Sequence, residues 1–200
     1  MNFKKGYLVL LLFISQISFS QEGIAIYSDY LSDNLYLIHP SMAGAANCAK
    51  VRLTGRQQWF GNDKAPALQT ASFNGRINDQ SGAGIILYND ENGFHSQRGF
   101  KLTYAHHILF SRTDVDLNQL SFGISGGLVQ SQLDQTEFVG FDPLIDNAIQ
   151  KDAYFNVDIG ASYNYLEFYT HFTVKNVLAS KRDIYTQAES DNLRKYIWSA

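Results

Sequence analysis

Histidines are the residues of this chain with the widest chemical range, because an imidazole can ligate a metal or move a proton near neutral pH. The chain has five of them. His106 and His107 are adjacent, so in a strand they point to opposite faces and could not share a metal ion. His39, His95 and His171 are scattered through the chain. We therefore predict no metal site.

An acidic stretch suggests a second kind of chemistry, the binding of calcium. Asp114, Asp116 and Asn118 have the spacing with which a calcium-binding loop begins. Such a loop needs glycine at its sixth position and glutamate at its twelfth, where this chain has Gln119 and Ser125. We interpret the stretch as a polar turn.

Nucleophilic catalysis would need a serine or histidine with an acidic partner. The chain has no Ser/His/Asp set whose order or spacing suggests a nucleophile. For a lipase or acyltransferase working at a lipid rim, His95 and Ser96 are the nearest candidates. The acidic loop around Asp142, Asp146 and Asp152 is either solvated or a substrate contact. We predict a protein that is not an enzyme and has no cofactor.

The composition favours strands and turns and excludes a nucleic-acid partner. Tyrosine occurs 12 times, phenylalanine 14 times and glycine 15 times, against 3 prolines, a mixture typical of β structure. Charged residues make up only 18% of the chain, the net charge is −3 and no Lys/Arg cluster is present. The single cysteine, Cys48, excludes an internal disulfide and does not lie at a cleavage site for a lipid anchor.

The first 20 residues have the organisation of a secretory signal peptide. Lys4 and Lys5 precede an apolar run at 7–14, which is roughly half the ~20 residues of a spanning helix. Ser18 and Ser20, small residues at the −3 and −1 positions, predict cleavage after Ser20. The mature protein is therefore expected to be exported. If it enters a membrane, it must cross as a β-barrel, since no other apolar run approaches that length.

Residues 51–60 alternate with the two-residue period of a strand. Val51, Leu53, Gly55, Gln57 and Trp59 fall on one face, opposite Arg52, Thr54, Arg56 and Gln58. Similar patterns predict strands at 68–77, 83–88, 99–110, 120–130, 155–165 and 167–176, with another beginning near Arg194. Their lengths cluster near the ~9–11 residues of a spanning strand, and several apolar faces end in aromatic residues.

The connections between these strands alternate in length. They cover 61–66, 78–82, 89–98, 111–117, 132–154, a tight reversal near Leu166, and 178–193. Outer-membrane barrels have short periplasmic turns and longer outside loops. If the first strand runs outward, the connections 89–98, 132–154 and 178–193 face the exterior. A soluble secreted β-sandwich fits this asymmetry poorly, and partition into detergent would separate the two.

We therefore predict an all-β transmembrane antiparallel β-barrel over residues 21–200, with an N-terminal segment at 21–49 before the strands. The sequence stops inside an apparent strand at 196–198. Because every edge of a membrane barrel must be paired, we expect this chain to be an N-terminal part of a longer barrel.

The charged side chains that would face the barrel interior form one predicted set. It consists of Arg52, Arg56, Lys101, Asp158, Glu167, His171 and Lys175. One interpretation is a network of charges and hydrogen bonds that stiffens the barrel. The other is a polar surface that grips a plug or a passing chain.

Three short motifs carry a family resemblance. A Tyr-rich segment at 27–36 precedes His39-Pro40-Ser41-Met42-Ala43-Gly44, then Arg56-Gln57-Gln58-Trp59 and Ala65-Pro66. This order resembles the PorP/SprF family, whose members have Asn-Pro-Ala-Tyr-Ala-Gly, Arg-x-Gln-Trp and Ala-Pro. His39, Ser41 and Met42 replace the family's Asn, Ala and Tyr. The resemblance covers the whole chain in layout and about residues 38–95 in motif.

The resemblance implies a non-enzymatic outer-membrane component of the type IX secretion system. Such a barrel would support secretion or surface attachment of exported proteins such as gliding adhesins. The implied partners are the periplasmic ring lipoproteins of this machine, the exported cargo and outer-membrane lipid. The alternative function is a passive outer-membrane pore or a transporter of hydrophobic compounds, with Gly123, Gly126 and Gly127 kinking its wall.

Overall fold

The computed structural model describes residues 34–61, 64–112, 117–136, 148–179, 181–185, 188–191 and 194–200. The predicted signal peptide lies outside these residues. So do Asp114 and Asp116 of the calcium-like stretch and Asp142 and Asp146 of the acidic loop.

The described chain is an antiparallel sheet of eight strands in the order β1-β2-β3-β4-β5-β6-β7-β10, which confirms the all-β prediction. The strands are β1 (Lys50–Gln57), β2 (Ala67–Asn78), β3 (Ser81–Asn92), β4 (His95–Arg112), β5 (Leu117–Asp134), β6 (Ile149–Tyr165), β7 (Phe168–Lys175) and β10 (Lys195–Ser199). A separate hairpin pairs β8 (Lys181–Tyr185) with β9 (Ala188–Asp191). Within the described residues, no helix is long and apolar enough to cross a membrane.

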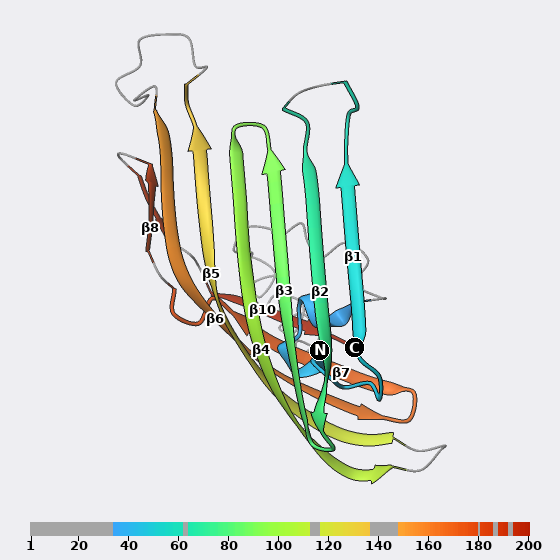
Figure 1. Ribbon diagram of the computed structural model, residues 1–200. Helices are drawn as coiled ribbons and strands as arrows, with labels where there is room; N and C mark the ends of the chain where they lie inside the picture. Colours follow the sequence, from blue (N-terminus) through green and yellow to red (C-terminus); the bar gives the residue numbers. More distant parts are fainter. Residues whose placement is uncertain are drawn as a thin grey trace, which may run out of the picture.

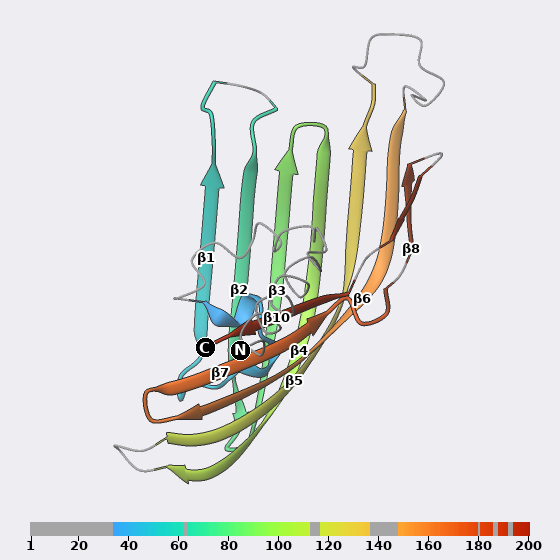
Figure 2. The same cartoon turned by 180° about the vertical axis from the view of Figure 1, so that it is seen from behind.

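The sheet curves into a trough, with β1 to β5 forming one wall and β6, β7 and β10 sweeping round to the other (Figures 1 and 2). Two 3-10 turns, η2 (Leu35–Leu37) and η3 (Pro40–Met42), lie on its concave side. β1 and β10 are the two edges of the sheet. This open, curved arrangement is that of part of a barrel.

The two faces of the sheet have the polarity of a membrane barrel rather than of a soluble protein. On the convex face the apolar residues Leu102, Ile124 and Phe155 are each about half exposed. Their neighbours along the strands, such as Thr103 and Ser125, are 5% exposed on the concave face. A soluble sandwich would bury the apolar row and expose the polar row, whereas a lipid-facing sheet does the reverse.

The loop predicted at 89–98 is wrong. β3 continues to Asn92 and β4 starts at His95, so only Gly93 and Phe94 connect them. Gly93 has a φ of +64°, which suits a tight turn. The prediction failed because the paired residues at this end of the hairpin, such as Asp90 and Gln97, are polar on both faces. The alternation of apolar and polar residues ends where the apolar, lipid-facing part of the strands ends. The hydrogen bonds between β3 and β4 continue beyond that point.

The other predicted connections keep their asymmetry. At one end of the strands, which we call the short-turn edge, the connections 79–80, 113–116 and 166–167 join β2 to β3, β4 to β5 and β6 to β7, and all three are short. The connections at the opposite end of the strands, which we call the long-connection edge, are 58–66, 93–94, 135–148 and 176–194, and the last of these includes the β8–β9 hairpin. Because β5 runs to Asp134 and β6 starts at Ile149, the predicted loop at 132–154 is shorter than expected.

Candidate functional site

The concave face is lined by buried polar side chains. They come from every second position of the strands, as the two-residue period requires. The buried polar set on the strands includes Thr70, Ser72, Asn74, Lys101, Thr103, His107, Gln119, Ser121, Ser125, Asn156, Asp158, Ser162, His171, Thr173 and Lys175. A buried polar group is costly unless it is hydrogen-bonded, so these side chains need partners.

Many of those partners come from residues Asn34 to Gly44, which we call the lumen segment. Pro40 opens η3, where its fixed φ suits the first helical position. Gly44, with a φ of +68°, turns the chain toward β1. The segment lies in the trough, and all but Leu35 and Met42 are buried.

Four side chains of the lumen segment bond to hydroxyl groups on four different strands. Asn34 Nδ2 donates to Ser72 Oγ (2.9 Å), Tyr36 Oη donates to Thr103 Oγ1 (2.9 Å), His39 Nδ1 meets Thr173 Oγ1 (2.9 Å), and Ser41 Oγ meets Ser162 Oγ (2.5 Å). The second ring nitrogen of His39, Nε2, lies 3.0 Å from Ser199 Oγ on β10. The segment is thus bonded across the trough from β2 to β10.

The backbone of the lumen segment is also held by side chains. Lys175 Nζ donates to the Leu37 carbonyl (3.5 Å), His107 Nε2 to the Ala43 carbonyl (3.0 Å), and Arg76 Nε to the Gly44 carbonyl (3.0 Å), while Asn74 Oδ1 accepts from Gly44 N (3.3 Å). A carbonyl oxygen can only accept, so His107 Nε2 must carry a proton. Its Nδ1 then faces Ser121 Oγ at 2.8 Å. This arrangement selects one tautomer of His107.

A row of glycines on the concave face makes room for the segment. A Cβ added at Gly82 would lie 2.1 Å from the Ala43 carbonyl oxygen, and one at Gly123 would lie 2.3 Å from the Pro40 carbonyl carbon. At Gly84 it would lie 2.5 Å from Tyr36 Oη, and at Gly160 it would lie 3.0 Å from Pro40 Cδ. We call Gly82, Gly84, Gly123 and Gly160 the glycine row. Any side chain there would displace the segment or distort the sheet.

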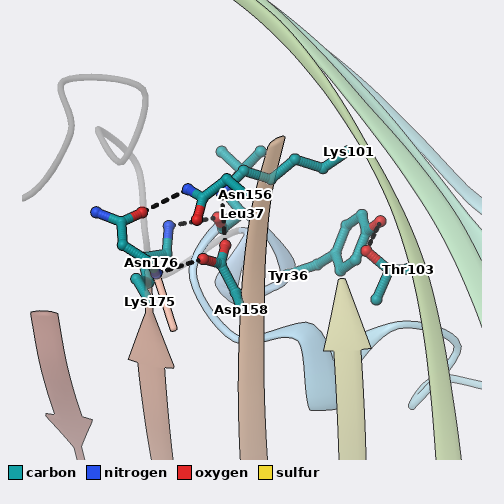
Figure 3. Close-up of polar contacts among 8 residues, drawn as sticks. All are labelled: Tyr36, Leu37, Lys101, Thr103, Asn156, Asp158, Lys175 and Asn176. Carbon is teal, nitrogen blue, oxygen red and sulfur yellow. Dashed lines mark hydrogen bonds and ion pairs between the residues drawn. The ribbon is translucent and has the colours of Figure 1, made fainter. Parts of the chain in front are cut away.

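A buried ion pair lies beside the lumen segment (Figure 3). Lys101 Nζ is 2.5 Å from Asp158 Oδ2, and both residues are at most 5% exposed. Asp158 Oδ1 also accepts from Asn176 N at 3.0 Å, and Asn156 Nδ2 donates to Asn176 Oδ1 at 2.5 Å. The carboxylate of Asp158 is therefore satisfied on both oxygens, as a buried charge must be.

The structure brings part of the predicted interior set together. Lys101, Asp158, His171 and Lys175 are buried on the concave face. Arg52 and Arg56 lie half-buried on the same side of β1, and Glu167 lies in the exposed turn between β6 and β7.

The motif residues divide between two places. His39, Pro40, Ala43 and Gly44 belong to the lumen segment. Arg56 and Gln57 are the last residues of β1, which ends at Gln57 and not at the predicted residue 60, so Trp59 lies beyond the strand. Gln58 N donates to the carbonyl of Pro66 (2.9 Å) and joins that motif to Ala65-Pro66. The sequence singled out His39 to Gly44 as a motif but did not show the partners that hold it, above all the glycine row and His107. The only signal of these contacts in the sequence was the spacing of glycines within single strands.

The structure also places the residues considered for metal binding and catalysis. His95 and Ser96 begin β4 at the long-connection edge, opposite Leu133 and Gln132 of β5. Within the described ranges, no group of three or more His, Cys, Asp or Glu side chains could hold a metal ion. Cys48 is exposed.

Burial keeps the ionisable groups of the lumen segment neutral. It raises the pKa of the Tyr36 phenol to about 12, against the smaller opposing effects of Thr103 and Lys101. Burial, with the nearby His171 and Lys175, lowers the pKa of the His39 imidazole to about 3. At neutral pH the side chains of Tyr36 and His39 are therefore uncharged and bind through neutral hydrogen bonds.

Replacing Tyr36 by phenylalanine tests one of these bonds. The ring is retained, but Thr103 Oγ1 loses its partner at a site where Thr103 is 5% exposed. We expect a loss of about 1–2 kcal/mol in the free energy of unfolding, the typical effect of one neutral buried hydrogen bond. Denaturant titration of Tyr36→Phe beside Tyr163→Phe, a residue on the lipid side, measures it. Equal stability of the two variants would contradict the prediction.

Comparison with known proteins was made on the whole chain. No curated protein and no solved structure matches it. The sequence model of one family, described as type IX secretion system membrane protein PorP/SprF, matches residues 19–200. That match includes the lumen segment and every strand described above. The chain therefore belongs to the PorP/SprF family of type IX secretion system membrane proteins.

Proposed function

We propose that this protein is a non-enzymatic outer-membrane component of the type IX secretion system that supports secretion or surface attachment of exported proteins, gliding adhesins among them. Family membership supports the link to this machine. The observation that carries the proposed role is the filled trough, in which the lumen segment is bonded from β2 to β10. A filled interior suits a holding and docking component better than a passive pore.

The two ends of the strands suggest two docking regions. The connections 58–66, 135–148 and 176–194 belong to the long-connection edge, and the short turns belong to the short-turn edge. The lumen segment lies toward the short turns, because Ala43 faces Gly82, next to the 79–80 turn, and Ser41 faces Ser162, near the 166–167 turn. We assign exported cargo to the long-connection edge and the periplasmic ring lipoproteins to the short-turn edge.

Affinity purification tests this proposal. The tagged full-length protein is extracted from outer membrane with detergent, and its partners are identified by mass spectrometry, with an unrelated tagged barrel as the control. We expect ring lipoproteins and a large surface adhesin in the eluate. A variant whose 135–148 connection is replaced by a short Gly-Ser turn should lose the adhesin and keep the lipoproteins.

Deletion of the gene is a second test of the proposed function. Loss of the protein should abolish surface display of the adhesin, and the full-length gene should restore it. Unchanged display in the deletion strain would overturn the proposed role. A protein that purifies without partners and conducts ions in planar bilayers would favour the passive pore instead.

A further inference from the structure

We propose that the lumen segment is a removable plug. When seated, it closes the interior of the barrel near the short-turn edge. When unseated, it leaves a polar, water-lined passage along the concave face. This inference concerns the state of the interior and goes beyond the proposed docking of cargo and ring proteins.

The segment crosses the interior of the trough, as a plug does, and does not lie along one wall. Its side-chain partners Ser72, Thr103, Ser162 and Thr173 lie on β2, β4, β6 and β7, and His39 reaches Ser199 on β10. A segment bonded to both walls of a trough must cross the space between them. Figures 1 and 2 show η2 and η3 inside the curve of the sheet from both sides.

The interface has the properties of a contact that can open. It consists largely of hydroxyl, amide and imidazole groups, which water can solvate when the segment leaves. Among the described residues, two of its buried atoms, Asn34 Oδ1 and His171 Nδ1, have no hydrogen-bond partner. Such atoms gain partners when water enters, so they lower the cost of unseating. The apolar contacts come mainly from Tyr36, Leu37 and Ala43.

The concave face beneath the segment would line an open passage once the segment is unseated. Removing the segment exposes the glycine row, which has no side chains to fill the space left behind. A cavity of about 370 Å³ already remains beside the seated segment, lined by Tyr36, Met42, Arg52, Asn164 and His171 among others. A cavity of this size accommodates water where polar side chains such as Arg52, Asn164 and His171 can bond to it. Unseating the segment would extend this wet space along the trough.

Two opposing variants of the full-length protein test the plug. Gly123→Val places a side chain where the Pro40 backbone lies and should unseat the segment. Gly55→Val is the matched control, because a Cβ at Gly55 meets no atom within 4 Å on the convex face. Ser41→Cys with Ser162→Cys, in a Cys48→Ser background, should lock it, since the two Oγ atoms are 2.5 Å apart and a disulfide needs its sulfurs about 2.05 Å apart.

Ion conductance in planar bilayers is the main measurement. We expect the wild type and Gly55→Val to be closed most of the time, and Gly123→Val to show at least a tenfold higher open probability. The oxidised double-cysteine variant should be silent even at voltages that open the wild type, and a reductant should restore those openings. Maleimide labelling of Ala43→Cys, also without Cys48, should be slow in the wild-type background and at least tenfold faster with Gly123→Val.

The proposal fails if the locked variant conducts as the wild type does, or if Gly123→Val exposes position 43 without raising conductance. Should Gly123→Val not fold, shown by loss of the heat-dependent gel shift of barrels, the lock and its reversal by reductant still decide the question. The purified protein is free of cargo and ring proteins in these measurements. Failure of the plug is therefore distinguishable from failure of the proposed function.

Discussion

Replacing Asp158 by alanine is expected to destabilise the folded protein by about 3–5 kcal/mol, the usual effect of removing one partner of a buried ion pair. The substitution removes the carboxylate that lies 2.5 Å from the ammonium of Lys101, a residue that is only 5% exposed. Asn176 N loses its acceptor as well. Lys175, on the neighbouring strand, adds a second positive charge to the same region.

Urea unfolding of the full-length protein in lipid vesicles, followed by tryptophan fluorescence, measures this effect. The double variant Lys101→Met with Asp158→Leu should recover most of the loss, because no uncompensated charge remains from the pair. Glu91→Ala, at the exposed end of β3, is the control and should change stability by less than about 0.5 kcal/mol. A double variant less stable than Asp158→Ala would contradict this account.

Acidification is expected to weaken the seating of the lumen segment through His39. Seated, this imidazole has a pKa of about 3, whereas in water an imidazole has a pKa near 6.5. The unseated state therefore binds the proton more tightly. The contribution of His39 is fully present above about pH 6.5 and is lost as the pH falls toward 3. At pH 5 the loss should be about 2 kcal/mol, from about 1.4 kcal/mol per pH unit.

The groups that face His39 act in the same direction. The His171 ring centroid lies 5.1 Å away, and Lys175 is on the same strand, so a charged His39 would be desolvated and repelled. The partners Thr173 and Ser199 are hydroxyls and do not titrate in this range.

The His39→Asn variant isolates this effect, because it restores the family's residue and has no titratable group at position 39. Maleimide labelling of Ala43→Cys, in a Cys48→Ser background, is followed from pH 7.5 to pH 5 and corrected for the thiolate fraction. Labelling should rise with acid in the His39 protein and stay flat with His39→Asn. If the labelling of the two proteins changed with pH in the same way, the acid response would come from a group other than His39.

The sequence by itself determined the sheet and the two faces of its strands. The alternation at 155–165 predicted which side of β6 meets lipid, and Phe155 is exposed while Asn156 and Asp158 are buried. This succeeds because a strand's side-chain period is a property of neighbouring residues. The same local rule missed the ends of β3 and β4, where both rows are polar and only the hydrogen-bonded ladder defines the strand.

Only the tertiary structure decided what fills the trough. His39 stood out in the sequence only as a motif residue, yet it bonds to Thr173 and Ser199, 134 and 160 residues away. His107 looked like half of an unusable pair, yet it holds the Ala43 carbonyl. Gly82 was assigned to a connection and Gly123 to a kink in the wall, yet both make room for the segment. The two-residue period of a strand determines to which face each side chain points. Which residue that side chain then contacts depends on how distant strands curve around a common interior.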